Sequence, residues 1–172
     1  RSSRRGMLGA PCAPCCGGEA MSEAGFFTIG LDFDGSISAQ DTLSSRLDNV
    51  VDLRVLEDDL RLYAGPRGVN SLRENLRLMR RAYPQPWLTF LGSGDFHHCT
   101  LALLETLEVS GPFVLVLIDN HPDWFSERPA YHCGNWVSSA LELPHLASAW
   151  LVGQDSTDLR GHQFWSAPWD AL

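Results

Sequence analysis

An apolar run, Phe113-Val-Leu-Val-Leu-Ile118, is followed at once by the polar residues Asp119, His121 and Asp123. A run of this length, rich in β-branched residues, predicts a fully buried strand. Residues two apart in an extended backbone point to the same side, so the three polar side chains are expected to converge at the strand's C-terminal end. Two carboxylates and one imidazole are ligands that suit a divalent ion such as Mn²⁺ or Zn²⁺. The pattern therefore predicts a metal site at this strand end.

A second apolar segment, residues 87–91, has the same arrangement of polar residues after it. It predicts a strand followed by a glycine turn that contains Asp95, His97 and His98, and then a helix over residues 100–108. In a strand–turn–helix unit such side chains lie at the strand's C-terminal end. We therefore expect this turn to contribute to the same site. A third polar cluster, residues 131–136, contains His132 and Asn135 and is a further candidate.

The remaining pattern predicts alternating strands and helices, which favours a mostly parallel sheet and an α/β fold. The expected elements are a strand over 26–33, a short helical stretch from Asp41, a strand over 49–56, a helix from Asn70 or Ser71 to Ala82, a helical turn over 138–143 and a strand over 149–153. Residues 1–20 have no periodicity and are expected to be a disordered leader or a non-native extension, which leaves one domain over 21–172.

Composition narrows the class of protein. Of the 172 residues, 44% are hydrophobic, which suits one sizeable core. The net charge of −8 argues against nucleic acid or an anionic membrane as a main partner. No apolar run approaches the ~20 residues that span a bilayer. The odd number of cysteines, five, does not suggest a disulfide framework, and the expected location is the cytoplasm.

The two strand-end motifs resemble those of a known family. Asp119-Asn-His-Pro-Asp123 is similar at every defined position to the Asp-x-His-x-Asp motif of the arginase-like ureohydrolases, which include arginase, agmatinase and formiminoglutamase. Their Gly-Gly-Asp-His motif is matched imperfectly, because Phe96 stands between Asp95 and the first histidine. His97 aligns best with the family's metal histidine, and His98 stays open as the alternative. The resemblance covers about residues 26–155.

The resemblance implies a three-layer α/β fold with a mostly parallel sheet, as in arginases and deacetylases, and two Mn²⁺ ions bridged by a hydroxide. It also implies a small-molecule substrate, the hydrolysis of C–N bonds in guanidino or amidino compounds, and a possible homo-oligomer. The family's roles carry over to this chain as follows: His97, Asp119, His121 and Asp123 as metal ligands, with Asp119 bridging; His132 and Asp123 in catalysis; Asn135 as a substrate contact.

The chain departs from the family in one respect. No Ser-x-Asp-x-Asp motif follows, so the sequence is expected to be the N-terminal portion of the fold. The alternative hypothesis is a non-catalytic remnant of that fold. A different class is suggested by Asp32-Phe-Asp34-Gly-Ser36, which looks like the nucleophile motif of haloacid-dehalogenase-type phosphatases. There Asp32 would attack phosphorus and Asp34 would serve as acid and base. A structural turn is the alternative for these two carboxylates.

Overall fold

The computed structural model describes residues 25–125 and 131–157. Its elements alternate as an α/β fold should, and most strand pairing is parallel. Strand β1 (Phe27–Asp32) lies between β2 (Asn49–Asp52) and β4 (Trp87–Leu91), and both pairings are parallel. The α/β class and its parallel strand pairing are therefore confirmed.

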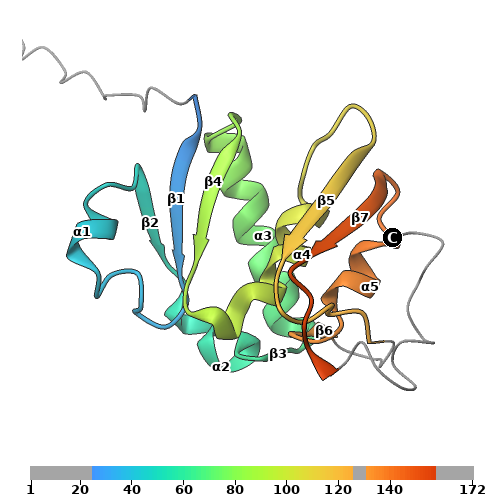
Figure 1. Ribbon diagram of the computed structural model, residues 1–172. Helices are drawn as coiled ribbons and strands as arrows, with labels where there is room; N and C mark the ends of the chain where they lie inside the picture. Colours follow the sequence, from blue (N-terminus) through green and yellow to red (C-terminus); the bar gives the residue numbers. More distant parts are fainter. Residues whose placement is uncertain (1–24, 126–130, 158–172) are drawn as a thin grey trace, which may run out of the picture.

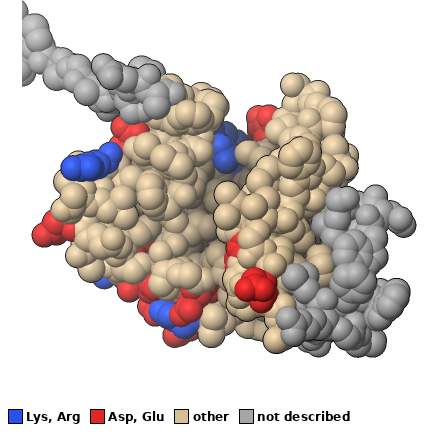
Figure 2. All heavy atoms as spheres, in the orientation of Figure 1, with Lys and Arg blue, Asp and Glu red and all other residues tan. Residues whose placement is uncertain are grey.

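The strands of the described residues do not form one sheet. A second parallel pair joins β5 (Phe113–Ile118) to β7 (Leu146–Val152), and a short antiparallel pair joins β3 (Tyr63–Ala64) to β6 (Tyr131–His132). In Figure 1 the two parallel sheets lie on either side of α3 and α4, and Figure 2 shows a hollow between them. Among the described residues β4 and β5 do not pair with each other. Each of these two strands therefore has one edge without a hydrogen-bonded neighbour in that part of the chain.

Helix α3 (Pro66–Ala82) is the longest in the described residues and carries a buried apolar stripe. Val69, Leu72 and Leu76 are at most 3% exposed, as the helical spacing of the sequence predicts. The helix begins four residues before the expected cap at Asn70, because Pro66 occupies its first turn. Proline is well suited there, since its missing N–H would have no partner inside the helix.

The other helices are short, and their bounds differ from expectation by a few residues. Helix α4 ends at Glu105 and not at 108. The Thr106 amide there donates to the carbonyl of Leu103 at 3.3 Å, and its hydroxyl donates to that of Ala102 at 2.9 Å. The expected turn over 138–143 begins earlier, as α5. The short helices are α1 (Asp41–Ser44), α2 (Glu57–Leu60), α4 (Thr100–Glu105) and α5 (Trp136–Ala140), with 3₁₀ segments at Arg54–Leu56 and Gly94–Cys99.

Strand β5 is not fully buried, which corrects the expectation from its unbroken apolar run. Val114, Val116 and Ile118 are 48%, 54% and 79% exposed, while the alternate residues Leu115 and Leu117 pack against the core. Within the described part of the chain β5 pairs with β7 alone, and one face of this two-stranded sheet meets the core. An apolar run shows that a strand avoids water but not which of its faces finds a cover.

One hydrophobic core links the elements, with Ile29 and Leu31 of β1, Leu72 of α3, Ala102 of α4 and Val137 of α5 among its buried members. None of the helices in the described ranges has the length and apolar character needed to cross a bilayer. The expected leader, residues 1–20, lies outside the described residues.

Candidate metal centre

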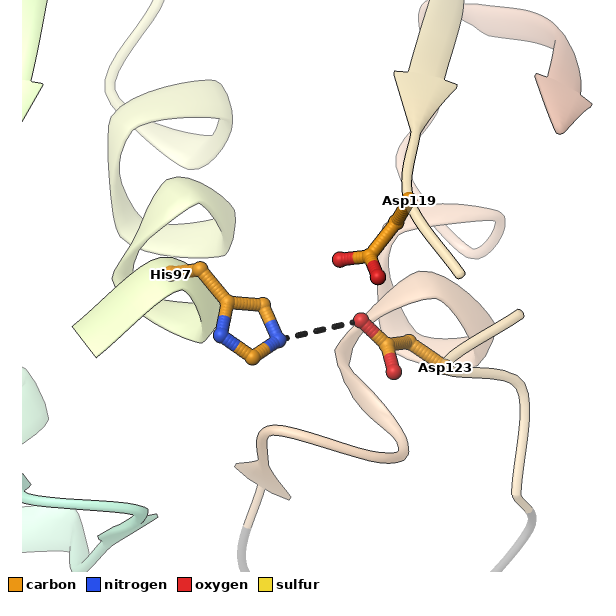
Figure 3. Close-up of side chains that lie close together, drawn as sticks. All are labelled: His97, Asp119 and Asp123. Carbon is orange, nitrogen blue, oxygen red and sulfur yellow. Dashed lines mark hydrogen bonds and ion pairs between the residues drawn. The ribbon is translucent and has the colours of Figure 1, made fainter. Parts of the chain in front are cut away.

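Three side chains from two distant segments meet beyond the ends of β4 and β5. His97 lies in the 3₁₀ segment that follows β4, Asp119 follows β5 directly, and Asp123 is four residues further on. One ligand atom of each lies within 4.8 Å of the others. Figure 3 shows the imidazole facing the two carboxylates. Two carboxylate oxygens and an imidazole nitrogen form a donor set that suits Mn²⁺ or Zn²⁺.

The imidazole of His97 is held from both sides. Its Nδ1 lies 2.7 Å from the carbonyl oxygen of Gly94, and its Nε2 lies 3.1 Å from Oδ2 of Asp123 and 3.2 Å from the carbonyl of Cys133. The hydrogen bond to Asp123 is the main reason that the pKa of His97 rises to about 9. A proton on His97 thus supplies positive charge beside the carboxylates. With Nδ1–H donated to Gly94, Nε2 is the nitrogen that can bind a metal.

Asp123 is the buried member of the group, with 3% exposure. Its Oδ2 accepts a hydrogen bond from the indole Nε1 of Trp136 at 2.8 Å, in addition to its contact with His97. Its backbone adopts a φ of +50°, which is uncommon for a residue with a side chain, and its carbonyl accepts from the amide of Val137 at the start of α5. A buried carboxylate is costly unless donors or a cation surround it. This residue is therefore fixed in place and suited to a positive ligand.

Asp119 and His121 do not lie along one extended strand as the sequence predicts, because β5 ends at Ile118 and the chain turns. Oδ1 of Asp119 accepts from the backbone amide of His121 at 3.1 Å, which closes a local turn. The His121 side chain is 58% exposed, its Nδ1 lies 3.9 Å from Oδ1 of Asp119, and it is outside the three-residue group. Asp119 and Asp123 therefore come together through a turn and not along an extended strand, and His121 stays a predicted ligand at the rim.

His98 points away from the two carboxylates and into the core, whereas His97 points toward them. His98 is fully buried, and its Nδ1 lies 3.4 Å from the sulfur of Cys133. Burial is the largest cause that lowers its pKa to about 4, so the ring is neutral. His97 is the histidine that faces the carboxylates.

The extra residue Phe96 is accommodated by the 3₁₀ geometry of the turn. Its ring is fully buried and stacks on Phe33 with centroids 4.9 Å apart. The guanidinium of Arg61 lies 5.1 Å from the Phe96 ring centroid and forms ion pairs with Asp95 and Glu57. Asp95 thus faces Arg61 and Phe96 faces the core, which leaves His97 to face the site.

The loop over 131–136 lies against His97 through the carbonyl of Cys133. Asn135 is 4% exposed, and its Oδ1 accepts from the amide of His132 at 2.7 Å, so this side chain braces the loop. The substrate contact of Asn135 stays a prediction. His132 is not one of the three converging residues; its Nδ1 accepts from the amide of Gly134 at 3.1 Å, which leaves a proton on Nε2. Burial raises the pKa of the Cys133 thiol to about 11, so it is not a reactive thiolate.

Two supporting residues were not identified from the sequence. Trp136 is buried in the core, and its indole Nε1 also donates to Asp123. Arg61 carried no motif at all, yet its ion pairs hold the turn before His97. No local signal marks either residue at the site, because the contacts of Trp136 with Asp123 and of Arg61 with Asp95 join separate segments of the chain.

The chain is similar to a protein of Thermotoga maritima described only as an uncharacterized protein. The two are 31% identical over 136 residues, which cover 79% of this chain and 52% of the relative. The chain therefore spans about half the length of the curated relative it matches. No protein-family model and no solved structure matches the chain.

The carboxylates of the alternative motif have a structural environment. Asp32 is 1% exposed, and its two oxygens accept from the backbone amides of Ile37 and Ser38, at 3.2 Å each, and from the Ser38 hydroxyl. Asp34 accepts from the amide of Ser36 at 3.2 Å and lies 3.6 Å from the Arg61 guanidinium. These contacts tie down the loop after β1 and favour the structural reading of the motif.

Proposed function

We propose that this protein is a divalent-metal-dependent hydrolase that cleaves C–N bonds in guanidino or amidino compounds. The observation that carries the proposal is the convergence of His97, Asp119 and Asp123 from two segments of the chain. Three protein ligands leave coordination positions for water and substrate, as in catalytic metal sites. The resemblance of the two motifs to ureohydrolases supplies the reaction class.

The donor set fits the ion that this function needs. His97 can present Nε2 while Gly94 holds its Nδ1–H, and Asp123 is held by the Trp136 indole. Asp119 has a 29% exposed side chain and stands on the solvent side of the group. A bound Mn²⁺ ion would lower the pKa of a coordinated water and stabilise negative charge during attack on the substrate carbon.

The chain's own residues would attract the substrate and orient it. The carboxylates attract a cationic guanidinium to the site, in a chain whose net charge is already −8. His132 accepts from the Gly134 amide at Nδ1, so its Nε2–H could donate a hydrogen bond to the substrate or to the departing group. Both roles are proposals for this chain and follow the family resemblance.

The complete reaction is proposed for a protein of the relative's length. The family's second ion needs aspartates from a motif that these residues lack, with His121 and Asp119 as its only candidates here. A second pair of ligands could come from a segment that corresponds to the part of the relative that this chain does not match. The present residues would then hold one ion, and the non-catalytic remnant stays an alternative that turnover decides.

Metal titration tests the proposal. We expect one Mn²⁺ to bind with an affinity that falls at least about a hundredfold in Asp119→Asn and in His97→Ala, since each removes one of three ligands. His145→Ala is the matched control, because His145 is an exposed histidine outside the group. Equal Mn²⁺ affinity in all four proteins would contradict the proposal.

Turnover separates the function from the remnant. Release of amine or urea from guanidino compounds by the Mn²⁺-loaded protein, lost in Asp119→Asn, would support the hydrolase. Metal binding without turnover across arginine, agmatine and formiminoglutamate would favour the remnant. Phosphate-ester hydrolysis lost in Asp32→Asn would favour the phosphatase.

A further inference from the structure

A second candidate site lies at the other end of β4 from the metal centre. A cavity of about 150 Å³ is lined by Arg77, Arg80 and Arg81 of α3 and by residues at the end of α4, among them Glu105 and Glu108. Strand β4 begins at Trp87, next to this cavity, whereas His97 follows its far end. Figure 2 shows basic side chains near the end of α3 that leads into β4. The two sites are therefore separate.

The cavity has more positive than negative charge. Arg73 engages both oxygens of Glu105, at 2.5 Å to Oε2 and 2.5 Å to Oε1, so this carboxylate is already neutralised. Among the described residues, Arg77, Arg80 and Arg81 form no ion pair. Glu108 is the one remaining carboxylate in the lining. Three guanidinium groups thus face a single free carboxylate.

Arg80 is held in place without a carboxylate partner. Its guanidinium lies 3.7 Å from the centroid of the Trp87 ring, and the Trp87 indole is fixed by a 2.9 Å hydrogen bond to the carbonyl of Tyr83. Its Nε is buried and has no hydrogen-bond partner in the described part of the chain. Burial lowers the pKa of Arg80, which is the sign of a charge that its surroundings do not compensate. A bound anion would compensate it.

We propose that the cavity formed by Arg77, Arg80 and Arg81 binds a phosphate-type dianion. Guanidinium groups match phosphate oxygens with paired N–H donors, and three of them against one free carboxylate leave an excess of positive charge for a doubly charged ligand. The stacking of Arg80 on Trp87 reduces the ordering that binding requires. The competing explanation is that these arginines only complement the C-terminal end of the α3 dipole.

An NMR titration of the whole chain tests the site, followed at the Trp87 indole and at the amides of residues 105–108. We expect saturable shifts with inorganic phosphate, and weakening of at least about tenfold in Arg80→Met, which keeps the apolar stem over Trp87. Arg77→Gln provides the same test if Arg80→Met fails to fold. Arg67→Gln is the matched control, since Arg67 is an exposed arginine of α3 outside the cavity, and it should leave phosphate affinity unchanged.

Two comparisons complete the design. Sodium chloride at the same ionic strength should cause no saturable shift if the site selects a dianion. Methyl phosphate tests whether the site accepts a phosphate ester as well as free phosphate. Binding as tight as that of phosphate shows that a monoester fits, and much weaker binding shows that the site prefers the free ion. Equal phosphate affinity in wild type, Arg77→Gln and Arg80→Met, or equal shifts with chloride, would overturn the proposal.

Discussion

His97 and His98 are neighbours whose rings meet edge to face, with centroids 6.1 Å apart and planes at 90°. The 3₁₀ geometry directs one ring to the carboxylates and the other into the core. Their pKa values therefore move in opposite directions, to about 9 for His97 because it hydrogen-bonds Asp123, and to about 4 for His98 because it is buried. This separation makes the two histidines testable one at a time.

We expect His98 to make the fold sensitive to acid. Its pKa is about 4 in the folded chain and near 6.5 when exposed, so the unfolded chain takes up a proton first as pH falls. The free energy of unfolding should therefore decrease from about pH 6.5 down to about pH 4. Denaturant titrations across this range should show a smaller decrease in His98→Gln, with His145→Gln as the control. The same pH slope in His98→Gln and wild type would contradict this assignment.

We expect metal and proton to compete for His97. Its raised pKa stabilises the metal-free fold below about pH 6.5, and this contribution is lost as pH rises through about 9. A metal needs the neutral ring, so Mn²⁺ affinity should rise about tenfold per pH unit up to about pH 9. Calorimetry at several pH values measures the slope.

In the metal-free protein, NMR should find His97 titrating near pH 9 in wild type and nearer its ordinary value in Asp123→Asn. Titration near pH 6.5 in both proteins would refute the contact between His97 and Asp123.

We expect Trp136→Phe to weaken metal binding without removing a ligand. The change deletes the indole N–H that donates to Oδ2 of Asp123 at 2.8 Å, and such supporting contacts are worth about 10–100-fold in metal affinity. Mn²⁺ titration of the variant measures the loss. Trp150→Phe, at a 63% exposed tryptophan of β7, should leave the affinity unchanged. Equal loss in both variants would point to a general effect on folding.

We expect Asp32→Ala to destabilise the fold and not to remove chemistry. It leaves two backbone amides and the Ser38 hydroxyl without their buried acceptor, a loss on the order of 3 kcal/mol. Chemical denaturation measures the change, and Asp58→Ala, at an exposed carboxylate of α2, should have little effect. A variant as stable as wild type would show that Asp32 does not stabilise the loop after β1, and would favour its alternative role as a nucleophile.

Periodicity and motif spacing were sufficient for the local elements. The apolar stripe of α3 and the strands at 87–91 and 113–118 follow from patterns that a few neighbouring residues carry, and the structure confirms them. The sequence also predicted that the polar residues after these two strands share one site. The structure brings the ligand atoms of His97, Asp119 and Asp123 of that set within 4.8 Å of one another.

Only the tertiary structure decided how these elements combine. It separated β5 and β7 from the β1 sheet and left Val116 half exposed, because pairing and cover depend on distant segments. It likewise determined the directions of His97 and His98 and placed the Trp136 indole where it donates a hydrogen bond to Asp123. A chain's local pattern determines which residues avoid water and which can bind a cation. The partner that each one meets is determined by contacts between residues far apart in the sequence, and those exist only after folding.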